Sequence, residues 1–177
     1  MMKRIFTPRF IAEAGIIAAL YFALTMAAQP ISFGPLQVRI SEALCILPFF
    51  TPAAIPGLFI GVVLSNLVGS PLGPYDIVFG SLATLVAAAM TYGIFRFGKK
   101  CGDADAKVSR WFLPLPAVVV NAFVVAAILQ HYIPELANAY WVTAGYVAAG
   151  QVIACYVLGI PLFFLLNKHK NTLFRRI

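Results

Sequence analysis

Six runs of apolar residues divide the chain, and short polar or proline-containing stretches separate them. The runs cover residues 10–28, 39–50, 56–68, 74–97, 111–131 and 140–166. A helix needs about 20 apolar residues to cross the hydrocarbon core of a bilayer. Runs 39–50 and 56–68 are shorter than that, whereas the other four approach or exceed it. These two short runs flank the sequence TPAAIP (residues 51–56), whose prolines interrupt any continuous helix. They could form two short helices or one re-entrant hairpin, and either arrangement returns the chain to the same side.

The distribution of basic residues gives the expected orientation. Of the 13 Lys and Arg residues, all but Arg39 fall in three regions of the chain. The first region precedes the first run, the second extends from the end of the fourth run to the start of the fifth, and the third follows the sixth run. With six crossings these regions share one side of the membrane, which the positive-inside rule makes cytoplasmic. We therefore predict an all-α protein of one domain, residues 1–177, folded as a six-transmembrane-helix bundle in the cell membrane with both termini cytoplasmic.

Composition supports this prediction and explains the net charge. Hydrophobic residues make up 62% of the 177 residues and charged residues 11%. Soluble domains average about half apolar and a quarter charged, so the chain is neither disordered nor typical of a soluble enzyme. The net charge of +7 comes from short basic tethers at helix ends rather than from one basic face, and we expect no nucleic-acid partner.

The sequence lacks the motifs of common enzyme classes. It contains no G-x-x-x-x-G-K-[ST] phosphate loop, no H-E-x-x-H and no G-x-S-x-G. Cys45, Cys101 and Cys155 are widely spaced, so they indicate buried thiols rather than a disulfide framework or a metal site. We expect no catalytic residues, cofactor or metal, and the chain is more typical of a channel, carrier or binding subunit than of an enzyme.

Polar residues within the apolar runs are the candidates for a binding site, because burying them in a membrane is costly. The candidates are Arg39, Glu42, Asn66, Asp76, Ser81, Thr84, Asn121, Tyr140, Trp141 and Gln151. With six crossings the charged members lie near the outer surface, whereas Asn121 and Gln151 lie near mid-membrane. A polar pocket that opens outward above an apolar floor is typical of a capture site, whereas a pore would carry polar lining through both leaflets.

Spacing along the helices suggests how the charges are arranged. Arg39 and Glu42 are three residues apart and could pair, which would leave Asp76 free to accept hydrogen bonds from a ligand. Asp76, Gly80 and Thr84 recur every four residues and share one helix face. Structural alternatives stay open: the ion pair could be purely structural, Asp76 could be a helix-start residue, the amides could bond neighbouring helices, and the aromatic pair could belong to an interfacial belt.

Small residues follow one face of the first run. Gly15, Ala19 and Ala23 recur every four residues, and Ala14 and Ala18 run beside them. Such faces let helix backbones approach closely in lipid, so this one could contact a partner protein or another helix of the same chain. The basic residues before the run also resemble the start of a cleavable signal peptide, but the acidic residue within it favours a retained helix.

Two stretches of the sequence resemble a known family. The stretch QVRISEALCILPFFTPAAIPGLFIG (residues 37–61), followed by Asn66, and the stretch YDIVFGSLATL (residues 75–85) are similar to the QueT family. Members of this family are the queuosine-precursor substrate-binding (S) components of energy-coupling factor transporters. The resemblance is clearest over residues 10–98 and looser over 111–166.

The resemblance implies partners and a substrate. S components are six-helix membrane proteins that capture a solute outside the cell and bind a transmembrane coupling protein and two ATPase subunits. A small-residue face on the first helix makes that contact. The docking residues would then be Ala14, Gly15, Ala18, Ala19 and Ala23.

The implied substrate is a 7-deazaguanine base. Its flat ring suits stacking on Trp141 or Tyr140, and its N–H donors suit Asp76 or Glu42 as acceptors. Residues 30–38 would form a lid over the site. The alternative function is a stand-alone secondary carrier, whose uptake would be insensitive to ATP depletion; a membrane enzyme or assembly factor would instead turn over a lipid substrate.

Overall fold

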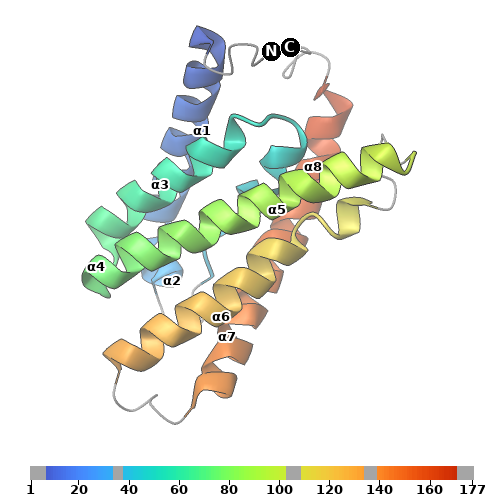
Figure 1. The fold of residues 1–177 in the computed structure, drawn as a ribbon. Helices are drawn as coiled ribbons and strands as arrows, with labels where there is room; N and C mark the ends of the chain where they lie inside the picture. The colour runs from blue at the N-terminus through green and yellow to red at the C-terminus, as the bar shows by residue number, and fades with distance from the viewer. Residues whose placement is uncertain (1–6, 34–37, 103–108, 134–138, 171–177) are drawn as a thin grey trace.

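The computed structural model describes residues 7–33, 38–102, 109–133 and 139–170, and this part of the chain is built from helices, with no strand (Figure 1). In chain order the elements are α1 (Pro8–Ala27), α2 (Gln29–Ser32), η1 (Ile40–Phe49), α3 (Ala54–Gly69), α4 (Gly73–Tyr75), η2 (Asp76–Gly80), α5 (Ser81–Lys100), η3 (Ser109–Trp111), α6 (Leu115–Tyr132), α7 (Tyr140–Val152), η5 (Ile153–Leu158) and α8 (Gly159–Lys168). The predicted all-helical class is confirmed.

Four stretches of the described residues are long and apolar enough to cross a membrane. They are Pro8–Ala27, Gly73–Lys100, Ser109–Tyr132 and Tyr140–Lys168, and each begins and ends within a few residues of a predicted run. The two short runs form the shorter apolar helices Ile40–Phe49 and Ala54–Gly69. The number of crossings and the side of the termini therefore stay predictions.

The short element η1 lies inside the bundle. Every residue from Ser41 to Phe49 is buried, and η1 contacts α1, α3, α5, α8 and η5. Pro48 within it has no N–H to donate and disfavours a regular α-helix, so the segment winds as a 3-10 helix. At about 2 Å of rise per residue, ten such residues span roughly 20 Å of the bundle interior. The residues at its start are thereby held among the surrounding helices.

Helices α1 and α3 pack closely through two glycines of α3. A Cβ atom at Gly57 would lie 2.8 Å from the carbonyl oxygen of Ala14, and one at Gly61 would lie 2.7 Å from Cβ of Tyr21. Only residues without a side chain allow backbones to approach this closely in lipid. Gly57 and Gly61 therefore define which face of α1 points inward.

An apolar core separates the interior polar residues from the end of the bundle where α5 ends. Its aromatic centre is Phe49, whose ring centroid lies 4.8 Å from that of Phe95 and 5.1 Å from that of Phe163, in edge-on geometry. Edge-on aromatic pairs are favoured because the ring faces are negative and the edges positive. This core corresponds to the apolar floor expected from the sequence.

Candidate functional site

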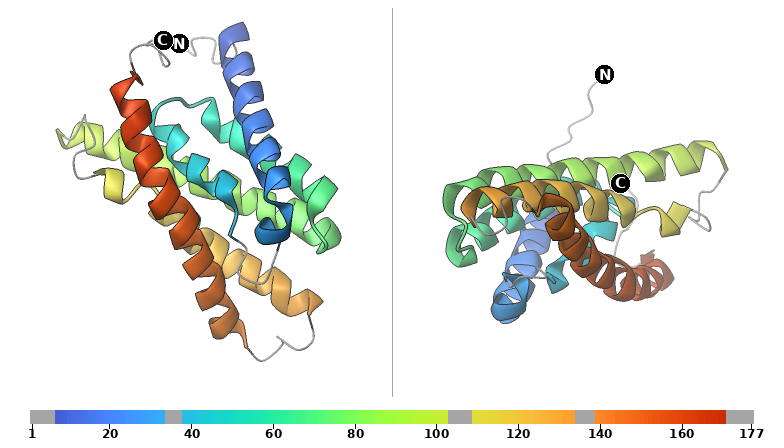
Figure 2. Two further views of the ribbon diagram at one scale, coloured as in Figure 1. Left: turned by 180° about the vertical axis from the view of Figure 1, so that it is seen from behind. Right: turned by 90° about the horizontal axis from the view of Figure 1, so that it is seen from below.

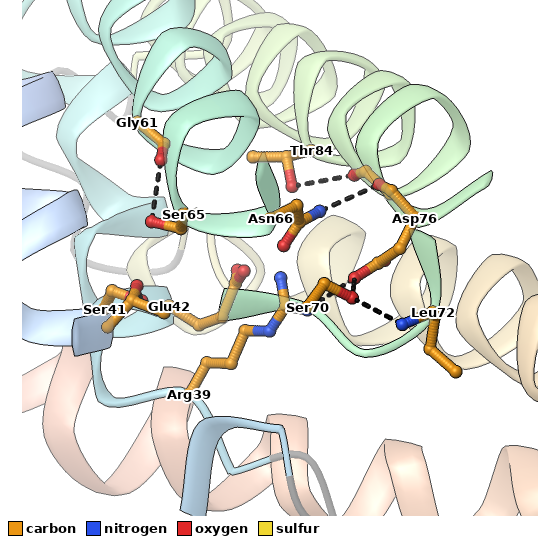
Figure 3. A network of polar contacts seen from close by, with 12 residues as sticks. Arg39, Ser41, Glu42, Gly61, Ser65, Asn66, Ser70, Leu72, Asp76 and Thr84 are labelled. Carbon is orange, nitrogen blue, oxygen red and sulfur yellow. Dashed lines mark hydrogen bonds and ion pairs between the residues drawn. The ribbon is translucent and has the colours of Figure 1, made fainter. Parts of the chain in front are cut away.

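Arg39 and Asp76 form a buried ion pair (Figure 3). Nη2 of Arg39 lies 3.3 Å from Oδ2 of Asp76, and the two residues are 5% and 1% exposed. The guanidinium also lies over the ring of Phe33, 4.9 Å from its centroid, a cation–π contact that favours a desolvated cation. The predicted pairing of Arg39 with Glu42 is wrong, because Arg39 precedes the helix that begins at Ile40 and α-helical i,i+3 spacing does not apply there.

The position of Asp76 depends on a π-helical segment and on two residues of the α3–α4 region. Asp76 begins η2, and π segments insert an extra residue into a helix, often at functional sites. The hydroxyl of Ser70 donates to Oδ2 of Asp76 at 2.6 Å, and the amide of Asn66 donates to its main-chain carbonyl at 2.8 Å. A Cβ at Gly80 would lie 2.5 Å from Oδ1, so glycine leaves the carboxylate its space.

Several polar atoms around this pair are buried without a hydrogen-bond partner in the part of the chain that the structure describes. They are Nε of Arg39, Oδ1 of Asn66, Oδ1 of Asp76 and Oγ of Ser81. A buried polar atom left unpaired costs about 1–3 kcal/mol, so such atoms are uncommon. We call Arg39, Asn66, Ser70, Asp76 and Ser81 the Arg39–Asp76 cluster. Its free donors and acceptors make it the candidate binding site.

A second buried polar group surrounds Glu42. The hydroxyl of Tyr21 donates to Oε1 of Glu42 at 2.5 Å, and the hydroxyls of Thr25 and Ser41 lie 2.7 Å apart. Glu42 is 2% exposed, so the tyrosine hydroxyl supplies a bond that water would otherwise provide. A cavity of about 10 Å³ lies between Tyr21, Glu42 and Thr84. This space is too small for a heterocyclic base, so binding one requires side chains to move.

The other predicted site residues are not all brought together. Thr84 is buried and donates to the carbonyl oxygen of Gly80 at 3.3 Å. Gln151 is buried and accepts a hydrogen bond from the thiol of Cys155 at 3.5 Å, and Asn121 is buried on α6. Neither amide is hydrogen-bonded to the Arg39–Asp76 cluster.

The aromatic pair at the start of α7 is separate from the cluster. Trp141 is 74% exposed, and its ring packs edge-on against Phe123, with 6.3 Å between the centroids. The hydroxyl of Tyr140 donates to the carbonyl oxygen of Phe123. These contacts with α6 fit interfacial anchoring, so stacking of a base on either ring has no support in this geometry.

Sequence reasoning missed Ser70 and Tyr21. Ser70 follows the end of α3. Its role in the site comes from a hydrogen bond to the carboxylate of Asp76, six residues away, which no sequence motif indicates. Tyr21 lies on the same α1 face as Ala14 and Ala18, and a polar residue in that position of an apolar run is a signal that could have been used. Part of the predicted lid, residues 34–37, lies outside the described residues, and Gln29–Ser32 before it forms the short helix α2.

Metal binding receives no support in the described ranges. No group of three or more His, Cys, Asp or Glu side chains there could hold a metal ion. Cys45 and Cys155 are buried free thiols, and Cys101 is exposed. The contacts described for the Arg39–Asp76 cluster are hydrogen bonds and an ion pair.

Comparison with known proteins identifies the family. The sequence pattern of the QueT transporter family matches residues 11–168, which is most of the chain. The chain belongs to the QueT transporter family. Over 87 residues it is 37% identical to the "Queuosine precursor transporter QueT" of Lactococcus lactis subsp. cremoris (strain MG1363), in an alignment that covers 48% of this chain. The chain spans about half (50%) of the length of that curated relative. No solved structure matches the chain.

In this QueT family member the small-residue face of α1 divides into two registers. Ala14 and Ala18 are 7% and 5% exposed and pack against α3, which is the contact within the same chain that the sequence left open beside docking. Gly15, Ala19 and Ala23 are exposed, and a Cβ at Gly15 would meet no atom within 4 Å. The tight α1–α3 contact uses the first register, which leaves only the second open to a partner.

Proposed function

We propose that this chain is the substrate-capturing S component of an energy-coupling factor importer, and that it binds a 7-deazaguanine base at the outer face of the cell membrane. Membership of a transporter family supports the general function. The name of the Lactococcus lactis relative supports a queuosine precursor as the substrate. The observation that carries the proposal is the set of unpaired buried atoms in the Arg39–Asp76 cluster.

Those atoms complement a guanine-like edge. Such a base presents a carbonyl acceptor beside ring N–H and amino donors. Oδ1 of Asp76 and Oδ1 of Asn66 are acceptors for the donors of the base, and the guanidinium of Arg39 is a donor for its carbonyl. Hydrogen bonds to charged groups are the stronger ones, so Asp76 and Arg39 would dominate the affinity. Because the cluster is closed, entry of the base requires the Arg39–Asp76 contact to open.

The positions of the cluster and of the basic residues support the proposed orientation. Helix α5 begins beside Asp76 and ends at Lys99 and Lys100. Its 20 residues extend about 30 Å, which is the thickness of the hydrocarbon core. If the basic end is cytoplasmic, the Arg39–Asp76 cluster lies at the outer surface. Six crossings, with η1 and α3 as the two short ones, give this arrangement.

The exposed register Gly15–Ala19–Ala23 would contact the coupling protein. The residues are small and lie on the α1 face directed away from α3, so the backbone of a partner helix can approach. Two ATPase subunits would supply the energy, since this chain carries no phosphate-binding loop. A stand-alone carrier would need no such partners, and its uptake would persist when ATP is depleted.

The test is titration of the purified chain with 7-deazaguanine bases, guanine and riboflavin. We expect tightest binding of a 7-deazaguanine base, and Asp76→Asn should weaken it about tenfold or more because a hydrogen bond to a charged group contributes about 1.5–3 kcal/mol. Thr91→Ala is the matched control, since Thr91 bonds to the carbonyl oxygen of Leu113 instead. Its affinity should be unchanged.

A second variant separates binding from stability. Ser81→Ala removes a buried hydroxyl that has no partner among the described residues, so the protein should unfold at the same or a higher temperature. If Ser81 bonds to the base, affinity should fall about threefold to tenfold for one neutral hydrogen bond. Absence of binding by every 7-deazaguanine base, or unchanged affinity in folded Asp76→Asn, would refute the proposed site.

A further inference from the structure

A large apolar cavity opens between α5 and α6, at the end of α5 far from the Arg39–Asp76 cluster. Its volume is about 690 Å³. Among its lining residues are Gly93, Ile94 and Phe97 of α5 and Phe112, Leu115 and Val119 on the α6 side.

The cavity is open to the surroundings of the bundle rather than to its core. Phe97 is 69% exposed, and Phe112 is 52% exposed. Both walls belong to stretches long and apolar enough to span a membrane, so the medium that faces the cavity is the bilayer. In the right view of Figure 2, α5 lies on the side of the bundle opposite α1, so the cavity is separate from the proposed docking register.

Positive charge gathers where the cavity reaches the end of α5. Among the described residues 96–102 and 109–110, four are basic and none is acidic: Arg96, Lys99, Lys100 and Arg110. Lys99 and Lys100 form the last turn of α5 and are exposed, directly before the lining residue Cys101. Such a group of cations attracts an anionic lipid headgroup.

Arg110 adds a second observation at this end. Its guanidinium lies over the ring of Phe164 at 5.0 Å and that of Trp111 at 6.0 Å, next to the lining residue Ser109. Nε of Arg110 is buried and has no hydrogen-bond partner in the described ranges. Because the guanidinium is held against α8 and Arg110 does not line the cavity, it adds positive charge at this end without reaching into the cavity.

We propose that this cavity binds one acyl chain of an anionic phospholipid, whose phosphate is held by the exposed Lys99 and Lys100. A flexible hydrocarbon chain conforms to an open apolar cleft, and the phosphate complements the charges at its end. The lipid would brace α5 against α6 at the level of the cytoplasmic headgroups. This inference does not depend on the identity of the transported solute.

The experiment is native mass spectrometry of the purified chain in detergent with added phosphatidylglycerol or phosphatidylcholine. We expect one retained phosphatidylglycerol per chain and little phosphatidylcholine. Gly93→Leu should lose the adduct, because a Cβ at Gly93 meets no atom within 4 Å and the longer side chain fills the cavity without a clash. Gly145→Leu on α7 is the matched control, since Gly145 is equally unobstructed but does not line the cavity.

A charge variant tests the headgroup contact. The double variant Lys99→Gln/Lys100→Gln should remove the preference for phosphatidylglycerol over phosphatidylcholine. This double variant and Gly93→Leu should each unfold within a few degrees of the unaltered chain. Equal retention of the two lipids by the unaltered chain would overturn the proposal. So would full retention by Gly93→Leu, equal loss in Gly145→Leu, or a stable dimer that buries the α5–α6 face.

Discussion

Glycine-to-alanine substitutions on the two sides of α1 should have opposite effects. Gly61 of α3 faces the buried register of α1 (Ala14 and Ala18), and Gly15 belongs to the exposed register. Gly61→Ala places a methyl group 2.7 Å from Cβ of Tyr21 and 3.1 Å from the carbonyl oxygen of Ala18, whereas Gly15→Ala places one where no atom lies within 4 Å. Carbon atoms prefer separations of about 3.5–4.0 Å, so α1 and α3 must separate by nearly 1 Å at Gly61. Gly15→Ala should leave the packing unchanged.

The expected magnitude comes from the difference between the two variants. Replacing glycine by alanine inside a helix contributes up to about 1 kcal/mol of stability through helix propensity, and this contribution is common to both. Overpacking typically costs about 1–3 kcal/mol, and only Gly61→Ala incurs it. Gly61→Ala should therefore be about 1–3 kcal/mol less stable than Gly15→Ala, or roughly 2–4 °C in midpoint temperature for each kcal/mol.

The buried thiols provide the assay. In a Cys101→Ser background the remaining cysteines, Cys45 and Cys155, are 6% and 0% exposed. A thiol-reactive fluorophore should label them only as the bundle unfolds, which gives a thermal midpoint in detergent. Equal midpoints for Gly61→Ala and Gly15→Ala would refute the conclusion that the register of Ala14 and Ala18 packs against α3.

Two further predictions concern the Arg39–Asp76 cluster. Arg39→Met leaves the buried carboxylate of Asp76 without its cation and should destabilise the fold by about 3–5 kcal/mol, measured by the same thiol labelling. The double variant Arg39→Met/Asp76→Leu should recover much of that loss. If the losses of stability of the two single variants simply add in the double variant, the pairing is contradicted. Gly80→Ala puts a methyl group 2.5 Å from Oδ1 of Asp76, so titration should show weaker binding of a 7-deazaguanine base, while Gly145→Ala binds as tightly as the unaltered chain; equal affinities would show that the carboxylate position is unimportant.

Much of the fold was predictable because membrane helices are encoded locally. Each long apolar run became a helix with nearly the expected ends, since lipid forces every backbone group into internal hydrogen bonds. Thr7 and Pro8 illustrate the same local control: the hydroxyl of Thr7 accepts from the amide of Phe10, and Pro8 occupies the first turn. The 3-10 winding of η1 and the π segment at Asp76 were not predicted, because a run of apolar residues does not distinguish these windings from an α-helix.

The candidate site was predicted as a set of residues but not as a set of bonds. The polar positions stand out in an apolar sequence, and the four-residue spacing of Asp76 and Gly80 agrees with the 2.5 Å between a Cβ at Gly80 and Oδ1 of Asp76. The partner of Arg39 was predicted wrongly because the nearest acid in the sequence is three residues away, whereas the acid it contacts is 37 residues away. Periodicity describes one helix and carries no information about which other helix lies opposite.

The sequence by itself determined where the helices lie, that they are apolar enough for lipid, and which family the chain resembles. Only the tertiary structure decided that Ala14 and Ala18 face α3 while Gly15 faces outward, since two adjacent registers of small residues look alike along the chain. It also decided that Asp76 neutralises Arg39. Both results depend on helix packing, in which the space left by a glycine on one helix selects the face presented by another.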